Sequence, residues 1–364
     1  MTGPARNHSD VCLGGFLQAV ILVGGEGTRL RPLTYVTPKP MVPLFGVPFL
    51  ERTLLRLKEA GVDEVILAAG YLPGAIRDHF GDGSALGLKL TYVVEETPLG
   101  TAGALRNVAE HITGPFFVLN GDVLTSLDLR QMIEFHRAKG GLGVLHLIRV
   151  DDPSPFGCVA HDADGRITHF VEKPPPGTEP TNEINAGTYL LEASVLDAIE
   201  PGKNVSIERE TFPKLLASGA PLYAYTTDDY WLDVGRPEQY VQAHRDVLAG
   251  KLEIGVTKTS GVIAPSFVGE GTMIAPSAVV GPYAVLGARV RIEDNAIVRN
   301  SIVWDDVVVG TGALVEGAIL ASRVHVGERA SIATGCVIGH DVEVEPGVSV
   351  PPDTRLNGTQ AAPT

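Results

Sequence analysis

The sequence is poor in cysteine and in positive charge. Its three cysteines, Cys12, Cys158 and Cys336, are odd in number and widely spaced, so they form no recognisable disulfide framework or CxxC metal pair. That usage favours a reducing, cytoplasmic compartment. Lysine and arginine number 29 against 43 acidic residues, which gives a formal net charge of -14. Such a chain is poorly suited to nucleic acid or an anionic membrane surface, and a phosphate-bearing substrate would need local cations.

Long apolar runs are also lacking. No stretch approaches the length of a membrane span, and segment 11–23 lacks the basic start and the cleavage site of a secretory signal. We therefore expect flexible ends over residues 1–17 and 354–364. With 364 residues, 44% of them hydrophobic, the chain is long enough for two domains with sizeable cores.

Residues 18–250 alternate short β-branched runs with helical patterns. The runs AVILV, EVILAA, LKLTYVV, PFFVLN and LGVLHLI are strand candidates, separated by helical segments such as 48–61, 101–111 and 128–139. Pro48 suits a helix start and Gly61 a helix end. Near-continuous apolar strands between amphipathic helices predict an α/β domain whose sheet is mostly parallel and is covered on both faces.

A different pattern occupies residues 260–353. Aliphatic residues recur every six positions, with one residue missing after Val298 and another after Val315. A small or β-branched residue follows each aliphatic one by four places, as at Ala284, Ala313 and Cys336. This hexapeptide period predicts a parallel β-helix in which triangular coils stack on one another. The aliphatic positions are Val262, Val268, Ile274, Val280, Leu286, Ile292, Val298, Val303, Val309, Val315, Leu320, Val326, Ile332, Ile338, Val344 and Val350.

The segment VGGEGTRLRPLTYVTPKPM follows the first predicted strand. It matches neither the Walker A pattern nor the dinucleotide-binding GxGxxG pattern. However, Gly24, Gly25 and Gly27 allow backbone N–H groups to approach phosphate oxygens closely. Arg29 can clamp a phosphate with two N–H groups, and Lys39 is held between two prolines. The combination favours a polyphosphate site.

Two aspartates are candidates for metal binding. Asp122 follows the strand FFVLN, where a parallel sheet presents ligand-binding side chains, and Asp233 lies between apolar residues in YWLDVG. Either alone could be a helix cap or a turn residue. Together with the glycine loop they suggest a magnesium pair.

Polar residues in FVEKPPP and EINAGTY suggest a sugar site. Glu172 and Lys173 are adjacent at a strand end and point in different directions, so one can hold hydroxyls while the other meets a phosphate. Asn185 both donates and accepts hydrogen bonds, which suits a sugar hydroxyl. A surface ion pair at a strand end is the alternative interpretation.

Several motifs occur in a fixed order along the chain: GGEGTRLRPLTYVTPKPM, EETPLGTAGAL, FFVLNGDV, FGCV, FVEKP, INAGTYLL, VSIERETFPKL and YWLDVG. Together they resemble those of the sugar-1-phosphate nucleotidylyltransferases, most closely the mannose-1-phosphate guanylyltransferase branch of that family. The resemblance covers about residues 18–250 and implies a Rossmann-like nucleotidyltransferase domain. The β-helix of similar proteins is left-handed. The implied reaction is an in-line attack of mannose 1-phosphate at the α-phosphorus of GTP, with Mg²⁺ as cofactor, and gives GDP-mannose and pyrophosphate.

The resemblance also implies roles for individual residues. Arg29, Lys39 and Lys173 would act on the phosphates, and Asp122 and Asp233 would hold magnesium. The sugar would meet Gly157, Glu172 and Asn185. The nucleotide would be bound by Leu22, Gly24, Gly25, Gly27, Thr28, Glu95, Glu96, Gly100, Thr101 and Asn120.

The identity of the base is predicted from a carboxylate pair. Similar enzymes for thymidylyl or uridylyl transfer usually carry glutamine before PLG, whereas this chain has Glu95 and Glu96. Guanine presents two adjacent donors that one carboxylate can accept, so we predict guanine, unless these glutamates are only structural. A thymidylyl-, uridylyl- or adenylyltransferase and a non-catalytic regulatory paralogue remain alternatives. The β-helix could carry acyl transfer through His325 or His340, but assembly into a homo-oligomer is the preferred role.

Overall fold

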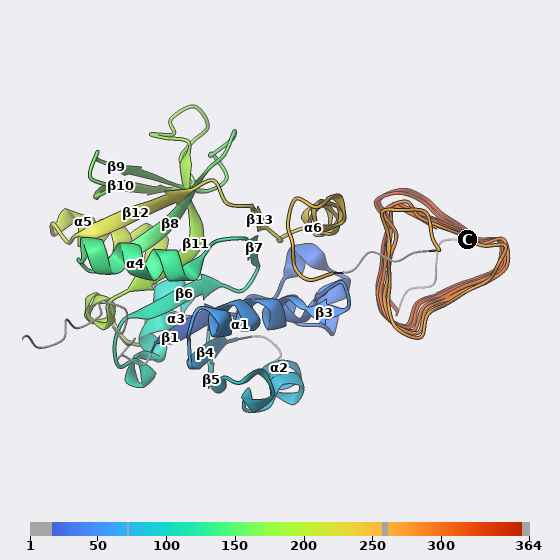
Figure 1. Cartoon of the computed structure of the whole chain (residues 1–364), viewed down its shortest axis with the longest axis horizontal. Helices are drawn as coiled ribbons and strands as arrows, with labels where there is room; N and C mark the ends of the chain where they lie inside the picture. The colour runs from blue at the N-terminus through green and yellow to red at the C-terminus, as the bar shows by residue number, and fades with distance from the viewer. Residues whose placement is uncertain (1–16, 71–72, 257–260, 359–364) are drawn as a thin grey trace, which may run out of the picture.

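The structure is a computed structural model and describes residues 17–70, 73–256 and 261–358. A layered α/β domain is followed by a triangular column of short strands, seen end-on in Figure 1. This arrangement confirms the predicted fold class, including the β-helix. Among the described residues, no helix combines the length and hydropathy needed to cross a bilayer.

The helices of the α/β domain and its junction are α1 (Phe49–Glu59), α2 (Pro73–Phe80), α3 (Gly100–Asn107), α4 (Leu129–Lys139), α5 (Phe212–Ala217) and α6 (Pro237–Ala249). Short 3-10 turns and one π-helical turn, η7 (Ile207–Thr211), connect them. The strands are β1 (Gln18–Leu22), β2 (Pro43–Leu44), β3 (Val47–Pro48), β4 (Glu64–Ala69), β5 (Lys89–Val94), β6 (Phe116–Asn120), β7 (Val123–Thr125), β8 (Gly143–Arg149), β9 (Gly157–His161), β10 (Ile167–Glu172), β11 (Glu183–Leu191), β12 (Leu222–Thr227) and β13 (Trp231–Asp233).

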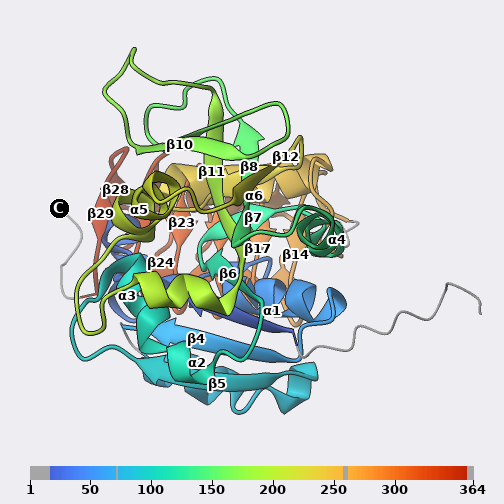
Figure 2. The ribbon, with the colours of Figure 1, turned by 90° about the vertical axis from the view of Figure 1, so that its left-hand side faces the viewer.

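The central sheet has nine strands. Its main path runs β10-β9-β11-β6-β1-β4-β5, and β8 pairs with both β11 and β12. Strands β6, β1, β4 and β5 are parallel, β12 is parallel to β8, and β11 runs antiparallel to β6, β8 and β9. The β9–β10 hairpin and the β4–β5 pair therefore lie at opposite ends of the sheet (Figures 1 and 2).

Alternate residues of the parallel strands supply two cores, one on each face of the sheet. Val20 and Val118 face α3 and α5, whereas Ile21 and Phe117 face α1 and α4. The strands are thus apolar on both sides, because helices cover both faces. Local signals set the helix ends as expected: α1 begins after Pro48, and the Asp128 carboxylate accepts from the N–H groups of Arg130 and Gln131 to cap α4.

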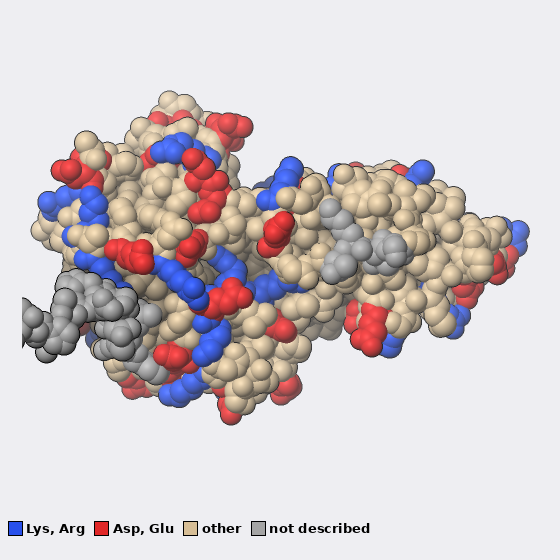
Figure 3. Space-filling view, in the orientation of Figure 1, with Lys and Arg blue, Asp and Glu red and all other residues tan. Residues whose placement is uncertain are grey.

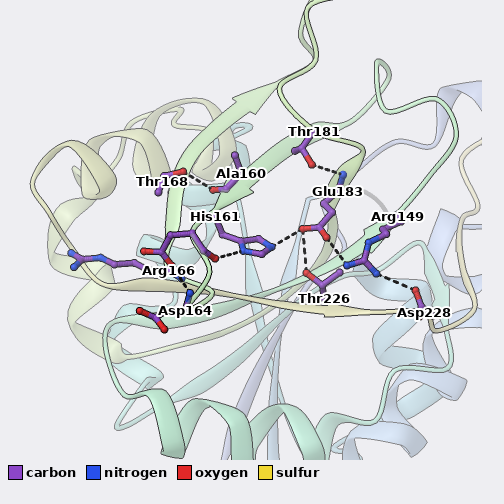
Figure 4. Close-up of polar contacts among 11 residues, drawn as sticks. Arg149, Ala160, His161, Asp164, Arg166, Thr168, Thr181, Glu183, Thr226 and Asp228 are labelled. Carbon is purple, nitrogen blue, oxygen red and sulfur yellow. Dashed lines mark hydrogen bonds and ion pairs between the residues drawn. The ribbon is translucent and has the colours of Figure 1, made fainter.

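A polar cluster supports the outer strands (Figure 4). The buried Glu183 of β11 accepts from Arg149 Nη2 at 2.7 Å and lies 2.7 Å from His161 Nε2. Thr226 Oγ1 donates to the same carboxylate at 3.4 Å. Strands β8, β9, β11 and β12 are therefore joined by side chains as well as by the sheet.

The second domain stacks short parallel strands in three sheets. They are β14 (Phe267–Val268), β17 (Val285–Leu286), β20 (Ile302–Val303), β23 (Ile319–Leu320), β26 (Val337–Ile338) and β29 (Arg355–Leu356); β15 (Met273–Ile274), β18 (Arg291–Ile292), β21 (Val308–Val309), β24 (His325–Val326) and β27 (Glu343–Val344); and β16 (Val279–Val280), β19 (Ile297–Arg299), β22 (Leu314–Glu316), β25 (Ser331–Ile332) and β28 (Ser349–Val350).

The predicted hexapeptide anchors form the core of this column. From Val280 onward every predicted aliphatic anchor is buried, and Ala284, Ala313 and Cys336 lie beside them. Phe267 pairs with Val285, whereas Val285 pairs with Ile302, so the second coil is one residue shorter than the first. The residue is missing from a corner between strands. The column extends past residue 353, because β29 pairs with β26 and buries Leu356. The expected flexible end at 354 therefore begins too early; residues 1–16 and 359–364 lie outside the described ranges.

The two domains share a continuous apolar interface. Leu30 and Leu33 of the segment after the glycine loop pack in one cluster with Ile319 and Val337 of the β-helix. At its edge, Arg355 Nη1 donates to the carbonyl oxygens of Arg29 at 3.2 Å and Arg31 at 2.9 Å. The last coil therefore supports the backbone that carries Arg29.

Candidate active site

The candidate site lies beyond the carboxyl ends of β1 and β6. Leu22 ends β1 beside Asn120, which ends β6, and the segments that follow both strands turn into one cavity of about 620 Å³. A polar cavity at this edge is where an α/β sheet binds ligands. The cavity brings together eight of the predicted residues: Arg29, Asn120, Asp122, Gly157, Glu172, Lys173, Asn185 and Asp233.

The glycine loop next to this cavity leaves its backbone open. Gly24 and Gly25 are exposed, and in the described part of the chain the N–H groups of Gly24, Gly25 and Gly27 donate to no other group. Gly27 has φ 62°, and a Cβ there would lie 3.0 Å from Lys39 Cβ. The glycine thus lets Lys39 pack against the loop, while Thr28 begins the turn that carries Arg29.

Basic side chains surround the two aspartates. The Lys39 ammonium contacts the Asp122 carboxylate, and a Cβ at Gly235 would lie 2.8 Å from Arg29 Nη2. Burial raises the pKa of the Asp233 carboxyl above its usual range, and repulsion from Asp122 raises it further, against the opposing effect of the nearby cations. These groups therefore interact at close range, as the sequence predicted.

The aspartate pair is compatible with a divalent cation. Asp122 precedes β7 and Asp233 ends β13, and these strands pair so that Asp233 lies opposite Val123. A cation between the two carboxylates would relieve the repulsion that raises the pKa of Asp233. No cluster of three or more His, Cys, Asp or Glu side chains suited to a metal occurs within the described ranges. Substrate oxygens and water would have to complete the coordination, as is common for magnesium.

Glu172 and Lys173 line the same cavity. Glu172 pairs with Gly157 across β9 and β10, and a Cβ at Gly157 would lie 2.6 Å from Glu172 Oε2. Burial raises the pKa of the Glu172 carboxyl, as does nearby Glu208. Lys173 has φ 51°, a conformation that costs a non-glycine residue energy and that often marks a functional position. Its ammonium lies 3.7 Å from Glu172 Oε1 and remains half exposed to the cavity.

Asn185 is fixed by its neighbours on β11. Its amide donates to Tyr189 Oη at 2.7 Å and accepts from the Gly187 N–H at 3.0 Å. The strand is irregular here, with Gly187 at φ 73°, and a Cβ at Gly187 would lie 2.6 Å from Asn120 Nδ2. Gly187 therefore lets Asn120 and Asn185 approach the same cavity.

Glu208 is a cavity residue that the sequence analysis missed. It lies on η7 and accepts from Thr101 Oγ1 at 2.7 Å and from Ser206 Oγ at 2.8 Å. Thr101 also accepts from the Ile207 N–H, so its hydroxyl joins α3 to η7. Trp231 and Arg236 were missed as well. The quoted VSIERETF contains Glu208, but no local spacing connects it to Thr101.

The residues predicted to read the base lie outside the cavity lining. Glu95 Oε2 accepts from the Leu99 N–H at 3.1 Å, next to the start of α3, and Glu96 is exposed. A Cβ at Gly24 would lie 3.9 Å from Glu95 Oε1, so this carboxylate faces the glycine loop. Gly100 has φ 70°, and a Cβ there would lie 2.6 Å from the carbonyl oxygen of Val205. Gly100 is thus needed for close packing.

Comparison with known proteins identifies the family. The protein-family model described as Nucleotidyl transferase matches residues 18–250, and the family model described as EIF2B subunit epsilon LbH domain matches residues 249–350. The chain belongs to the nucleotidyl transferase family. The resemblance inferred from the motifs is therefore confirmed.

Several similar proteins carry a more specific name. A mannose-1-phosphate guanylyltransferase of Mycobacterium tuberculosis is 42% identical, over 82% of this chain and 83% of that protein. Mannose-1-phosphate guanylyltransferase 1 of Arabidopsis thaliana is 37% identical, over 90% of this chain and 92% of that protein.

Solved structures share the α/β domain. HddC of Yersinia pseudotuberculosis complexed with GMP-PN has a TM-score of 0.53 and 34% identity, covering 62% of this chain and 97% of that one. A putative glucose-1-phosphate thymidylyltransferase of Bacillus anthracis has a TM-score of 0.59 and 25% identity, and the match covers 66% of this chain and 97% of that one.

Proposed function

We propose that the protein transfers the guanylyl group of GTP to mannose 1-phosphate, forming GDP-mannose and pyrophosphate. The observation that carries this proposal is one cavity that joins Arg29 and Lys173 to the aspartates Asp122 and Asp233 beside an open glycine loop. The names of the similar proteins support the choice of base and sugar.

The reaction needs positioning more than proton transfer. A phosphate monoester has a second pKa of about 6, so mannose 1-phosphate is largely dianionic at neutral pH and needs no general base. Two anions must instead be brought together with the attacking oxygen in line with the departing pyrophosphate. We assign this to Lys173 on the sugar phosphate and to Arg29 and Lys39 on the triphosphate. Their charges overcome the repulsion between substrates and an acidic protein.

We assign magnesium binding to Asp122 and Asp233. When bound, Mg²⁺ would neutralise charge that develops on the phosphate oxygens. The two carboxylates come from paired strands, so the protein holds them in a fixed relation before substrate arrives. Lys39 contacts Asp122 and would help to position that carboxylate.

On the sugar side, Glu172 and Asn185 are assigned to hydroxyl groups. Gly157 leaves the space in which the Glu172 carboxylate lies. Asn185 has one amide hydrogen beyond the bond to Tyr189, and among the described residues that hydrogen has no acceptor, so it can bind a hydroxyl oxygen. Asn120 lies beside Gly187 and lines the same cavity.

The base is assigned to the region of Glu95, Glu96, Gly100 and Thr101. Because Glu95 already accepts from the Leu99 N–H, the exposed Glu96 is the freer of the two carboxylates. A guanine preference that survives Glu95→Gln and Glu96→Gln together would refute this part of the proposal and leave the reaction itself intact.

A substrate panel tests the function. Purified protein with magnesium is assayed for pyrophosphate release from GTP, dTTP, UTP and ATP, each with mannose 1-phosphate and with glucose 1-phosphate. We expect the highest kcat/KM for GTP with mannose 1-phosphate. A higher value for another pair would assign a sister activity, and release from no pair by folded protein would favour a regulatory paralogue.

We further propose a cytoplasmic homo-oligomer assembled through the β-helix. Support comes from exposed apolar side chains on its first coils, Ile263, Met273 and Val279. Sedimentation of the chain and of Met273→Lys tests this: the variant should shift towards monomer, whereas an unchanged oligomer would place the contact elsewhere.

A further inference from the structure

A second cavity borders strand β7. Its volume is about 610 Å³, within the roughly 300–1,000 Å³ of small-molecule sites. Helix α1, the segment 123–130 and the residues 252–254 after α6 form its walls. Figure 3 shows the hollow near the middle of the molecule, bordered by basic and acidic side chains.

Three arginines line this cavity: Arg52, Arg56 and Arg130. Each donates only to main-chain carbonyl oxygens among the described residues, and none has a carboxylate within ion-pair distance there. Arg52 donates to the carbonyl oxygens of Leu44 and Ile254. Arg56 donates to that of Leu127, and Arg130 to that of Glu59. Because a guanidinium has five N–H donors, Arg56 and Arg130 retain most of theirs.

Two of these arginines, Arg52 and Arg56, are partly buried. Burial lowers the pKa of both Arg52 and Arg56. Nearby carboxylates oppose this effect only in part: Glu51 acts on Arg52, and Asp229 and Glu59 act on Arg56. Carbonyl oxygens are neutral and do not balance a desolvated charge.

The acidic side chains at this cavity are engaged elsewhere or exposed. Asp128 accepts from the N–H groups of Arg130 and Gln131 at the start of α4. Glu59 and Glu253 are exposed, where solvent and salt weaken their effect on the interior. Asp229 and Glu59 act on the charge of Arg56 without forming an ion pair among the described residues, so a bound anion would be a closer countercharge.

We infer that this cavity is a second ligand site, which binds a small phosphate ester through Arg56 and Arg130. The phosphate would take the remaining donors of these two side chains, because arginine binds phosphate oxygens in pairs. The apolar wall formed by Phe49, Leu124 and Leu252 would contact the carbon part of the ester. Binding here does not depend on the proposed nucleotidyl transfer.

Strand β7 offers a route for coupling between the two cavities. Val123 of β7 borders both cavities, and the pair β7–β13 forms a separate two-stranded sheet. A ligand that contacts β7 therefore lies one strand away from the residues of β13. Trp231 lies opposite Thr125 on this pair, and Thr125 lines the second cavity. The fluorescence of Trp231 should therefore respond to the ligand.

Titration calorimetry without nucleotide tests the site, with inorganic phosphate and a hexose 6-phosphate as separate probes. The full chain is compared with Arg56→Gln and Arg130→Gln. Arg137→Gln removes the same charge from an exposed position on α4 outside the cavity and is the matched control. Lys173→Ala identifies any binding that belongs to the first cavity.

We expect binding of the hexose 6-phosphate to weaken at least tenfold in Arg56→Gln and Arg130→Gln, and to persist in Arg137→Gln and Lys173→Ala. The tryptophan response should be lost in parallel. Tighter binding of inorganic phosphate than of the ester would assign the site to the free anion. Binding that is abolished by Lys173→Ala, equally weakened in Arg137→Gln, or absent would overturn the inference. Arg130 is exposed, so its variant serves if Arg56→Gln fails to fold.

Discussion

Gly157→Ala provides a sharp test of the sugar side of the cavity. The new Cβ would lie 2.6 Å from Glu172 Oε2 and 3.0 Å from the ring of Phe170. To reach an ordinary contact of 3.4 Å, the carboxylate must move by roughly 0.8 Å, and Phe170 limits the space. A hydrogen bond to a charged group contributes about 1.5–3 kcal/mol, so its loss should lower affinity about ten- to hundredfold.

The assay is steady-state kinetics with each substrate varied in turn. We expect KM for mannose 1-phosphate to rise by this factor, while KM for GTP changes little. Gly114→Ala is the matched control, because a Cβ there meets no atom within 4 Å. A folded Gly157→Ala enzyme with unchanged KM for mannose 1-phosphate would refute the assignment of Glu172.

Three further predictions concern the framework. Leu320 is fully buried in the β-helix, so Leu320→Ala should destabilise that domain by about 2–5 kcal/mol in urea unfolding, whereas a loss below 1 kcal/mol would contradict the packing. The pKa of His161 is raised by the Asp162 carbonyl and by Glu183. The protonated ring should therefore stabilise the fold fully below the ordinary histidine pKa of about 6.5, and this stabilisation should disappear as pH rises through the raised pKa. His161→Gln should abolish that decline in unfolding free energy, and an unchanged pH profile would count against it. Arg355→Ala removes the bonds to the carbonyls of Arg29 and Arg31 and should lower kcat/KM for GTP about two- to tenfold, unlike Arg289→Ala on the distant β-helix surface.

The fold was predictable because its signals are local. The hexapeptide period fixes which residues face the interior of each coil, and it located both shortened coils at Val298–Val303 and Val315–Leu320. The strand AVILV could be recognised because both faces of β1 are buried. Only the extent was underestimated, since β29 lies beyond the last regular anchor at Val350.

The candidate site was predictable where a motif follows a strand. Arg29 and Asp122 could be grouped because β1 and β6 are parallel and end at one edge of the sheet. Asp233 lies on the separate antiparallel β7–β13 pair, so only its own motif, YWLDVG, suggested it. The contact between Thr101 and Glu208 joins residues 107 positions apart and depends on where η7 packs. Likewise, the positive φ of Lys173 has no local signal in the sequence, because its neighbours are Glu172 and Pro174 and neither is glycine.

The stereochemical course at the α-phosphorus tests the central claim most directly. GTP with one defined α-phosphorothioate configuration is converted with mannose 1-phosphate, and the product configuration is determined by ³¹P NMR. A single in-line attack by the sugar phosphate, held by Lys173 and opposite the leaving pyrophosphate, predicts inversion. Retention would require two displacements through a covalent enzyme intermediate and would contradict the account.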